Sequence, residues 1–300
     1  MATPDSDCAN DNIVKRAFVF GASGQIGDAL LPLLRAAHAE VLAVSRQQHA
    51  DTDGVRWIVG ALDGTTDAST DCDVVFSLGP LDAFAQWQER VGPIAPRIVA
   101  FGSTSASTKS ASSDPAERDI AVRLGTAEET LFAFGAQHNV DVCVLRPTLV
   151  YGRGRDRTLS RIAAMAQRYG VFALPRNATG LRQPVHADDL ALAALAAANA
   201  SRSKGRAYDL PGGETLGFDE MVARTLAVLQ PRPRLLRLPT PLFRTMVGAA
   251  RGLGMIDAIN PAMLDRLDAG LVFDAAAARR DLAYAPRMFV PDAAMFAPPQ

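Results

Sequence analysis

Three glycines at regular spacing are the residues of this sequence whose chemistry is easiest to name. Gly21, Gly24 and Gly27 directly follow the apolar run 16–20 and precede a helix-forming run at 29–37. The first glycine permits a tight turn, the second lets the backbone approach a pyrophosphate, and the third lets the next helix pack closely on the sheet. The N–H groups that begin this helix then face the phosphates. Because the glycines stand between a strand and a helix, their spacing favours a dinucleotide-binding turn over a chance recurrence of glycine.

A group of arginines just after position 152 could also bind a ligand. The group consists of Arg153, Arg155, Arg157 and Arg161. Guanidinium groups bind phosphate oxygens through two parallel hydrogen bonds, so these residues could clamp a phosphorylated or nucleotide-linked ligand. The alternative is a solvated loop and helix face, and the sequence leaves the two interpretations even.

The sequence contains neither the residue spacing of a metal site nor the serine turn of a hydrolase. No group of His, Cys, Asp and Glu has the spacing of metal ligands. No Gly-x-Ser-x-Gly turn is available to expose a nucleophilic serine. We therefore expect no metal site and no serine hydrolase triad.

Strand and helix signals alternate in the first half of the chain, as they do in a series of βαβ units. A polar loop is expected at 102–115, followed by a helix with Asp114 as its cap that runs to about Gln137. A second helix is expected at 190–198, with Asp188 and Asp189 in its first turn. The apolar runs predict strands at 16–20, 40–44, 55–59, 73–77, 97–101 and 140–145.

The composition changes from about residue 151, where proline and arginine become frequent and helices are expected at 218–229 and 242–253. These patterns predict an α/β fold: a Rossmann-type doubly wound parallel sheet with a smaller mixed C-terminal substrate domain over its carboxyl edge. We expect the domains to divide as a flexible tail at 1–12, a dinucleotide-binding domain at 13–150 with about 183–212, and a smaller substrate-binding region at 151–182 and 213–300.

The bulk composition indicates which classes of partner and which cellular compartment to expect. A net charge of −1 gives no electrostatic reason to expect a nucleic acid or an anionic membrane surface as partner. No apolar run reaches about 18 residues, and the polar N-terminal stretch is unlike a secretory leader. The three widely spaced cysteines suggest no disulfide framework. We expect a cytoplasmic protein with a small-molecule substrate and no nucleic-acid or membrane partner.

Five segments, taken in order, resemble the extended short-chain dehydrogenase/reductases, also called the NAD-dependent epimerase/dehydratase family. Each segment is modest by itself, but five in the same order are specific, and they cover nearly the whole chain from about Ala17 to Phe289. The segments are the glycine turn at 21–27, Phe101-Gly-Ser-Thr-Ser105, Leu145-Arg-Pro-Thr-Leu-Val-Tyr-Gly152, Arg182-Gln-Pro-Val-His-Ala-Asp-Asp-Leu190 and the tail at 271–287.

The resemblance implies a set of residues that hold a dinucleotide. Arg46 stands where an acidic residue of the family would bind the adenosine ribose of NAD. An arginine there can pair with a 2′-phosphate instead, which favours NADP and leaves NAD open. After the third strand, Gly60-Ala-Leu62 replaces the family's Gly-Asp-Leu, so either adenine is discriminated less strongly or Asp63 substitutes. The implied cofactor-binding residues are Gly21, Ser23, Gly24, Gln25, Ile26, Gly27, Arg46, Leu62, Gly79, Pro80 and Pro147.

The resemblance also implies a substrate site. Thr104 occupies the position of a family hydroxyl that hydrogen-bonds a substrate carbonyl or alcohol. In the segment 182–190, the resemblance implies that Asp188 and Asp189 cap a helix and that His186 packs near the domain junction. The implied substrate-binding residues are Ser103, Ser105, Thr148, Arg153 and Arg155.

The family's acid–base pair is missing from this chain. The pair is Tyr-x-x-x-Lys on the helix after the fifth strand, where the lysine lowers the pKa of the tyrosine. Alignment on Ala127-Glu128 puts Ile120 and Leu124 at these positions, and none of the four tyrosines has a lysine four residues later. Thr104 remains the catalytic candidate. Lys109, on a flexible loop, is a weaker one, for which a solvated position is favoured.

Two functions follow as hypotheses. The first is an NADP-linked oxidoreductase or epimerase with a non-standard active site, acting on a carbohydrate-like or nucleotide-linked substrate. The second is a catalytically inactive dinucleotide-binding protein that serves as a redox sensor or scaffold, because a catalytic pocket usually keeps perturbed titratable groups. The resemblance also allows a homodimer through the helices that flank the fifth strand.

Overall fold

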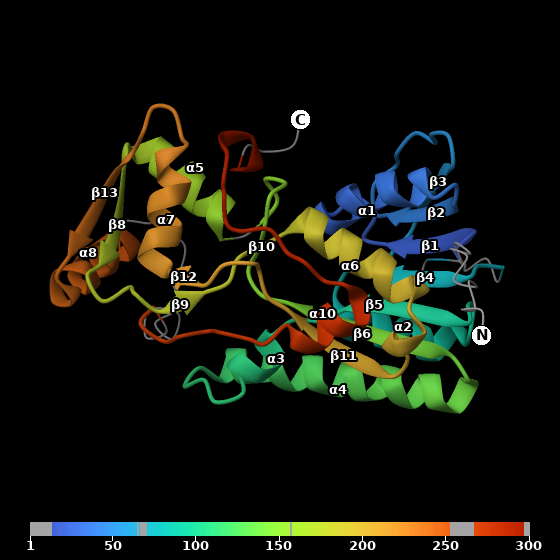
Figure 1. Cartoon of the computed structure of the whole chain (residues 1–300). Helices are drawn as coiled ribbons and strands as arrows, with labels where there is room; N and C mark the ends of the chain where they lie inside the picture. Colours follow the sequence, from blue (N-terminus) through green and yellow to red (C-terminus); the bar gives the residue numbers. More distant parts are fainter. Residues whose placement is uncertain (1–13, 65, 67–70, 157, 253–266, 297–300) are drawn as a thin grey trace, which may run out of the picture.

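A parallel sheet forms the centre of the larger part of the molecule (Figure 1). The computed structural model describes residues 14–64, 66, 71–156, 158–252 and 267–296, and within these ranges the sheet has seven strands. Their order is β11-β6-β5-β4-β1-β2-β3, and all neighbours run parallel. The order reverses between β1 and β4, as it does in doubly wound dinucleotide folds, so the predicted fold class is confirmed. The strands are β1 (Arg16–Phe20), β2 (Glu40–Ser45), β3 (Val55–Val59), β4 (Val74–Ser77), β5 (Arg97–Phe101), β6 (Asp141–Pro147) and β11 (Arg206–Leu210).

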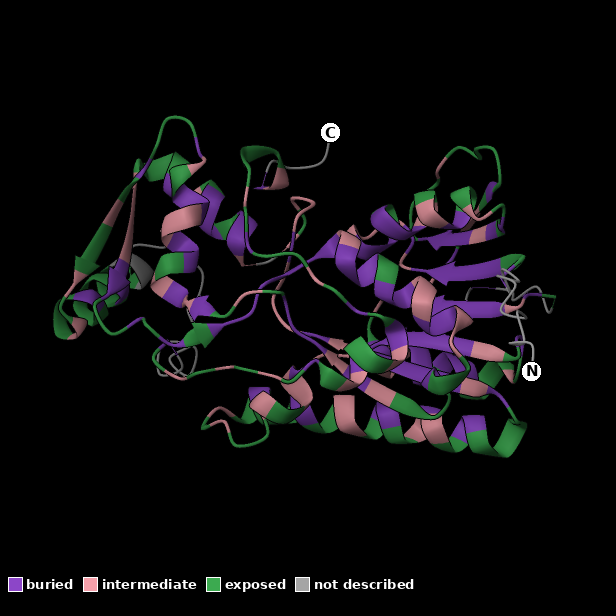
Figure 2. Ribbon diagram, in the orientation of Figure 1, coloured by how far each residue is buried: buried purple, intermediate pink, exposed green. Residues whose placement is uncertain are grey.

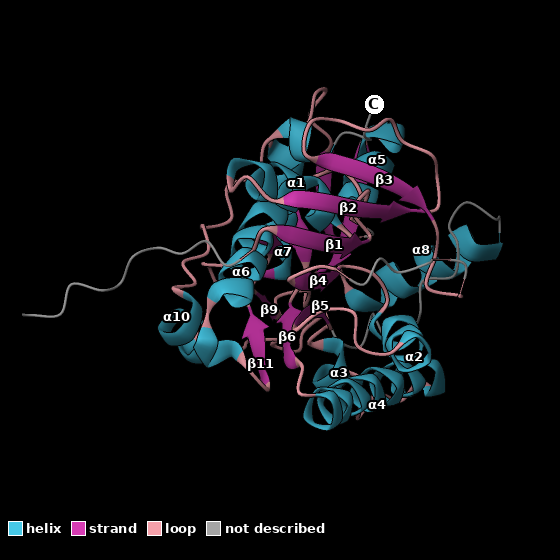
Figure 3. Cartoon of the chain, turned by 90° about the vertical axis from the view of Figure 1, so that its right-hand side faces the viewer, coloured by secondary structure: helices cyan, strands magenta, loops and turns pink. Residues whose placement is uncertain are grey.

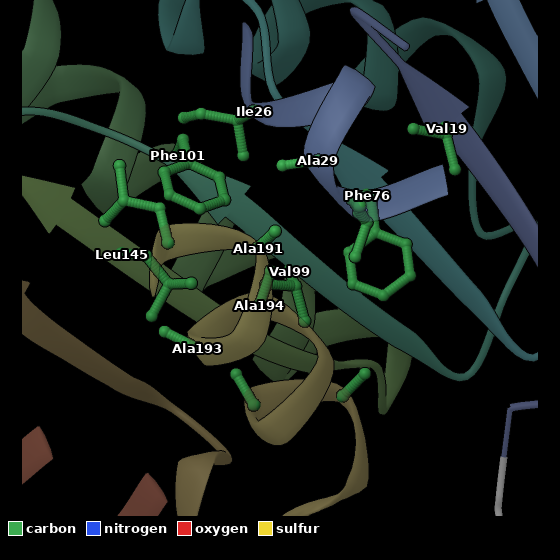
Figure 4. Close-up of a cluster of buried hydrophobic side chains, with 14 of the residues drawn as sticks. Val19, Ile26, Ala29, Phe76, Val99, Phe101, Leu145, Ala191, Ala193 and Ala194 are labelled. Atoms are coloured by element: carbon green, nitrogen blue, oxygen red, sulfur yellow. The ribbon is translucent and has the colours of Figure 1, made fainter. Parts of the chain in front are cut away.

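Helices cover both faces of this sheet, which is why its inner strands read as continuous apolar runs. α1 (Gln25–Ala36) and α6 (Ala187–Asn199) lie on one face, and α2 (Leu81–Val91) and α4 (Pro115–His138) lie on the other (Figure 3). The inner strands are accordingly almost entirely buried, whereas the edge strands β3 and β11 are partly exposed (Figure 2). Figure 4 shows the core beneath α1 and α6, where Phe76 of β4 lies among small side chains such as Ala194.

The N-terminal end of α4 follows its sequence signals. The Asp114 carboxylate accepts a hydrogen bond from the N–H of Ala116 at 2.9 Å, and Pro115 occupies the first turn. The helix ends at Asn139, whose left-handed backbone (φ 54°) closes the last turn. The long α4 therefore begins near the carboxyl end of β5, beside the ligand edge of the sheet.

A smaller lobe, on the left of Figure 1, lies beyond the carboxyl ends of the strands. It contains a parallel pair, β8 with β13, and its core is built on α5 and α7, with Tyr151 and Phe289 among the buried residues. Two short pairs, β7 with β10 and β9 with β12, connect it to the sheet. The elements are β7 (Val150–Tyr151), α5 (Leu159–Tyr169), β8 (Val171–Pro175), β9 (Leu181–Arg182), β10 (Val185–His186), β12 (Leu216–Gly217), α7 (Phe218–Ala227), β13 (Arg234–Leu238) and α8 (Thr240–Gly252).

Two segments differ from the sequence expectations. The polar stretch expected to be a loop contains a helical turn, α3 (Ser105–Thr108). Its serine and threonine hydroxyls bond backbone oxygens one turn earlier, as Ser107 Oγ does to Thr104 O at 3.0 Å. Near the C-terminus, α10 (Ala276–Leu282) packs against β11 and α6 of the larger part, although residues 213–300 were assigned to the smaller region. The expected tail at 1–12 and the end of the predicted helix 242–253 lie outside the described residues.

Within the described ranges, none of the helices has both the length and the apolar character that a membrane crossing requires.

Candidate functional site

The glycine turn lies at the point where the strand order reverses. Gly21 follows β1 with a φ of +72°, and a Cβ built on it would stand 3.1 Å from the carbonyl carbon of Leu78 and 3.2 Å from the nitrogen of Gly79. A side chain at Gly21 would therefore collide with the backbone that leaves β4. Ligands of open α/β sheets bind in the crevice at this reversal.

The first turn of α1 carries one carboxylate, Asp28, which is paired with Arg153. The N-cap residue is Gly24, which offers no side-chain oxygen, so no side chain caps the helix. A Cβ at Gly27 would lie 2.3 Å from the carbonyl oxygen of Ala22, which means that only glycine lets α1 approach the turn this closely. The first N–H groups of an uncapped helix are free to bind phosphate oxygens.

Two orphaned polar atoms test whether these residues fit a dinucleotide. Gln25 Oε1 and Ser77 Oγ are buried and have no hydrogen-bond partner among the described residues. Gln25 opens α1, and Ser77 ends β4 opposite Phe20 of β1, so both belong to the edge that carries Gly21. Buried polar groups are nearly always paired. The glycine turn and these two atoms therefore fit a polar ligand such as a dinucleotide.

The end of β2 lies next to the same turn and carries no acid. Ser45 Oγ lies 3.1 Å from Ser23 Oγ in the turn, while the Arg46 side chain that follows is exposed. From Ser45 to Ala50 the sequence contains no carboxylate. A ligand that reaches the end of β2 thus meets hydroxyls and a guanidinium.

The other implied cofactor residues follow the carboxyl ends of their strands. Gly79 and Pro80 follow β4, and Pro80 is the N-cap of α2. The Leu62 side chain, in the loop after β3, lies 3.8 Å from the position of a Cβ on Gly79. Pro147 ends β6. The structure brings Leu62 and Gly79 together, whereas Asp63 is exposed beside them.

The hydroxyls on the expected substrate side are bonded to the backbone. Thr104 is buried, and its Oγ1 donates to the carbonyl oxygen of Pro147 at 3.2 Å. Thr148 Oγ1 donates to the carbonyl of Gln183. Ser103 Oγ accepts from the N–H of Ser105 at 3.1 Å. The Thr104 hydroxyl is therefore bonded to Pro147, the residue that the resemblance places beside the nicotinamide.

Lys109 does not lie on a flexible loop as expected. It is the C-cap of α3, and its Nζ lies 4.0 Å from Glu117 Oε1. Glu117 is buried and accepts from Ser112 Oγ at 2.6 Å. The Lys109 ammonium thus stabilises a buried carboxylate at the start of α4.

Burial makes three of the four tyrosines weaker acids than usual. Burial raises the pKa of Tyr151 to about 12 and that of Tyr208 to about 12, and it also raises the pKa of Tyr284. A tyrosine acid–base catalyst needs the opposite shift. At the positions implied by the resemblance, Ile120 and Leu124 are half-buried on α4.

Arg153 has two carboxylate partners within the protein. It donates to Asp28 of α1 at 3.0 Å and to Asp188 of α6 at 2.7 Å. Arg155 is exposed, and Arg157 lies outside the described residues. Arg153 therefore joins the smaller lobe to the helix of the glycine turn, and its role in substrate binding stays a prediction.

The expected capping of α6 by its aspartates is wrong. The cap is His186, whose Nδ1 accepts from the N–H of Asp188 at 3.1 Å. Burial lowers the pKa of His186, which favours the unprotonated ring that an accepting nitrogen requires. Asp189 accepts instead from the N–H and the Nε of Arg287, both at 2.9 Å. Sequence reasoning missed this cap because histidine is not among the preferred N-cap residues.

Comparisons with known proteins agree with this architecture. Residues 121–210 match a family described as the NAD dependent epimerase/dehydratase family, which confirms the resemblance indicated by the motifs. A mitochondrial protein of Arabidopsis thaliana, named NADH dehydrogenase [ubiquinone] 1 alpha subcomplex subunit 9, is 28% identical over 107 residues. That match covers 35% of this chain and only 26% of the plant protein.

Solved structures share the fold over nearly the whole chain. UDP-glucuronic acid 4-epimerase from Bacillus cereus, in complex with NAD, is 13% identical with a TM-score of 0.67, covering 92% of this chain and 94% of its own. The enzyme WbmF from Bordetella bronchiseptica, in complex with NADH, is 15% identical with a TM-score of 0.68, covering 94% and 90%. MoeE5, in complex with UDP-glucose and NAD, is 21% identical with a TM-score of 0.65, covering 91% and 94%.

Proposed function

Residues 121–210 match the NAD dependent epimerase/dehydratase family within a fold shared with a sugar-nucleotide epimerase, and on this premise we propose that the protein binds NADP between β1 and β4. The observation that carries the proposal is the acid-free end of β2, where Arg46 follows the buried Ser45. A carboxylate at this place would repel a 2′-phosphate, whereas a guanidinium pairs with it. The uncapped start of α1 supplies N–H groups for the pyrophosphate.

The proposed reaction is an oxidoreduction or epimerisation of a carbohydrate-like or nucleotide-linked substrate. The nicotinamide of the bound cofactor supplies hydride transfer. The Thr104 hydroxyl donates to the carbonyl of Pro147 in the structure, and it can donate to a substrate oxygen instead when a substrate is bound. Arg155 is exposed after the turn at Gly152 and is available to an anionic substrate group. Because the side chains of Ile120 and Leu124 have no ionisable group, we assign the remaining proton transfer to water or to the substrate itself.

Replacement of Arg46 by alanine tests the cofactor assignment. We expect the affinity for NADPH to fall roughly 10- to 100-fold, because hydrogen bonds to a charged group are lost. The affinity for NADH should stay within about twofold, because NADH has no 2′-phosphate. Both are measured by titration of nicotinamide fluorescence. An unchanged ratio of the two affinities would refute the NADP assignment.

Replacement of Thr104 by serine and by alanine tests catalysis. On a substrate that the wild-type protein turns over, monitored at the nicotinamide absorbance, we expect the alanine variant to lose roughly 100-fold in kcat. The serine variant keeps the hydroxyl and should retain most of the activity. Equal activity of all three proteins would remove Thr104 from the mechanism.

A second candidate, a dinucleotide-binding protein without turnover, is favoured by the apolar Ile120 and Leu124 at the family's catalytic positions. Its role would be that of a redox sensor or scaffold, and the partial relative from Arabidopsis thaliana is named as a subunit of a larger enzyme. Tight NADPH binding without turnover on any sugar nucleotide or simple ketone would support this candidate over the enzyme.

We also propose that the protein is cytoplasmic and that it binds a small molecule. The thiols of Cys72 and Cys143 are free and buried, which suits a reducing cytoplasm. We propose a small molecule as the ligand, with neither nucleic acid nor membrane as partner. A homodimer through α2 and α4, the helices that flank β5, is part of the proposal.

A further inference from the structure

A chain of three polar side chains leads from the glycine turn to a histidine after β2. Ser23 Oγ lies 3.1 Å from Ser45 Oγ, and Ser45 Oγ lies 3.1 Å from Nε2 of His49. Ser45 is only 6% exposed, so the middle of the chain is shielded from water. The phosphate-binding turn and the end of β2 are thus joined through hydrogen bonds.

The second nitrogen of His49, Nδ1, stays outside this chain. Ser45 Oγ also accepts from the N–H of Gln47 at 3.2 Å, so its remaining lone pair and proton serve Ser23 and His49. When Ser45 donates to Nε2, the Nδ1 of His49 carries a proton and is a donor. A phosphate favours this tautomer, because a phosphate oxygen accepts hydrogen bonds from a ring N–H.

The imidazole is held in place by an aromatic neighbour. The ring of His49 lies against that of Trp57 from β3, with centroids 4.3 Å apart. The backbone of Trp57 is held in turn, because its main-chain N–H donates to Asp51 Oδ1 at 2.8 Å. A ring constrained on two sides loses little freedom when it binds a ligand.

From these contacts we propose that His49 is a specificity-determining residue that recognises the ribose 2′-phosphate together with Arg46. Ser45 acts as the positioning residue that fixes the ring. Between Ser45 and Ala50 there is no carboxylate, and the next one in the sequence, Asp51, accepts from the backbone N–H of Trp57. This inference rests on the proposed NADP binding and adds a second recognition group to it.

The test uses fragments that differ by one phosphate. Calorimetry measures the binding of 2′,5′-ADP and of 5′-AMP to the full-length wild-type protein and to the His49→Phe variant, which keeps a ring on Trp57 without nitrogens. We expect the affinity for 2′,5′-ADP to fall about tenfold, as for one lost hydrogen bond to a charged group, and that for 5′-AMP to stay within about twofold. The matched control is His138→Phe, a ring at the far end of α4 that lies 4.4 Å from Phe134. It should change neither affinity.

The outcomes separate this inference from the proposed function. If the wild-type protein binds 2′,5′-ADP no more tightly than 5′-AMP, the NADP assignment itself fails. If the wild-type protein and His49→Phe discriminate equally while Arg46→Ala does not, the cofactor assignment stands and the role of His49 is overturned. Should His49→Phe fail to fold, Ser45→Ala replaces it: loss of discrimination at an unchanged melting temperature supports the inference, and retained discrimination overturns it.

Discussion

Replacement of Gly27 by alanine should abolish NADPH binding and lower the free energy of unfolding by about 1–3 kcal/mol, the usual cost of overpacking. The added Cβ would stand 2.3 Å from the carbonyl oxygen of Ala22 and 2.6 Å from its Cα. Because both atoms belong to the backbone, α1 itself must move away from the turn. Its first N–H groups would then no longer be aimed at the pyrophosphate.

Fluorescence titration and urea denaturation measure these two effects. The matched control is Gly248→Ala in α8, where a Cβ meets nothing within 4 Å. That change should leave NADPH binding intact and raise the stability by up to about 1 kcal/mol, because alanine favours a helix over glycine. A Gly27→Ala protein that bound NADPH like the wild type would show that the turn is not the phosphate site.

Replacement of Arg146 by leucine should lower the free energy of unfolding by about 3–5 kcal/mol, because it leaves a charge buried without a partner. Glu128 on α4 is 4% exposed; Arg146 Nε shares its proton between the two carboxylate oxygens at 2.9 Å each, and Arg146 Nη2 donates to Oε2. Its Oε1 stands 3.0 Å from the position of a Cβ on Gly102, so the carboxylate is tightly enclosed. This ion pair thus links β6, which carries Arg146, to α4, which carries Glu128.

A double-mutant cycle with Glu128→Leu measures the pair by urea denaturation. The double variant should recover much of the stability lost in Arg146→Leu, because the buried charge of Glu128 is gone and only the partly exposed Asp209, 3.9 Å from Arg146 Nη1, loses a partner. Arg123→Leu is the exposed counterpart: Arg123 pairs with Asp119 and Asp82 at 2.9 Å each, and its loss should destabilise the protein much less than the loss of Arg146, because solvent screens these pairs. If the exposed and buried variants were equally destabilised, the burial of Glu128 would not be the cause.

The parts of the fold that follow from local pattern were predictable. β5 was expected at residues 97–101 and is found there, because an inner strand of a covered parallel sheet needs a continuous apolar run. The start of α4 at Pro115 was predicted equally well, since an aspartate followed by proline is a local signal.

The contacts that complete the site depend on distant residues. Ser23 meets Ser45 only because β1 and β2 pair in register, which places the ends of the two strands side by side. Arg153 and Asp28 are 125 residues apart in sequence, and no local pattern links them. The turn of α3 was missed because serine and threonine favour local hydrogen bonds that satisfy a loop as well as a short helix.

Arg153 also determines how the two parts of the molecule hold together. Its guanidinium lies between Asp28, in the first turn of α1, and Asp188, in the first turn of α6, and Arg287 adds a contact to Asp188 at 3.7 Å. These side chains are about one-third to one-half exposed, so dissolved ions screen them. The joint between α1 and the smaller lobe is therefore partly electrostatic, and its strength varies with ionic strength in a way that the apolar core beneath it does not.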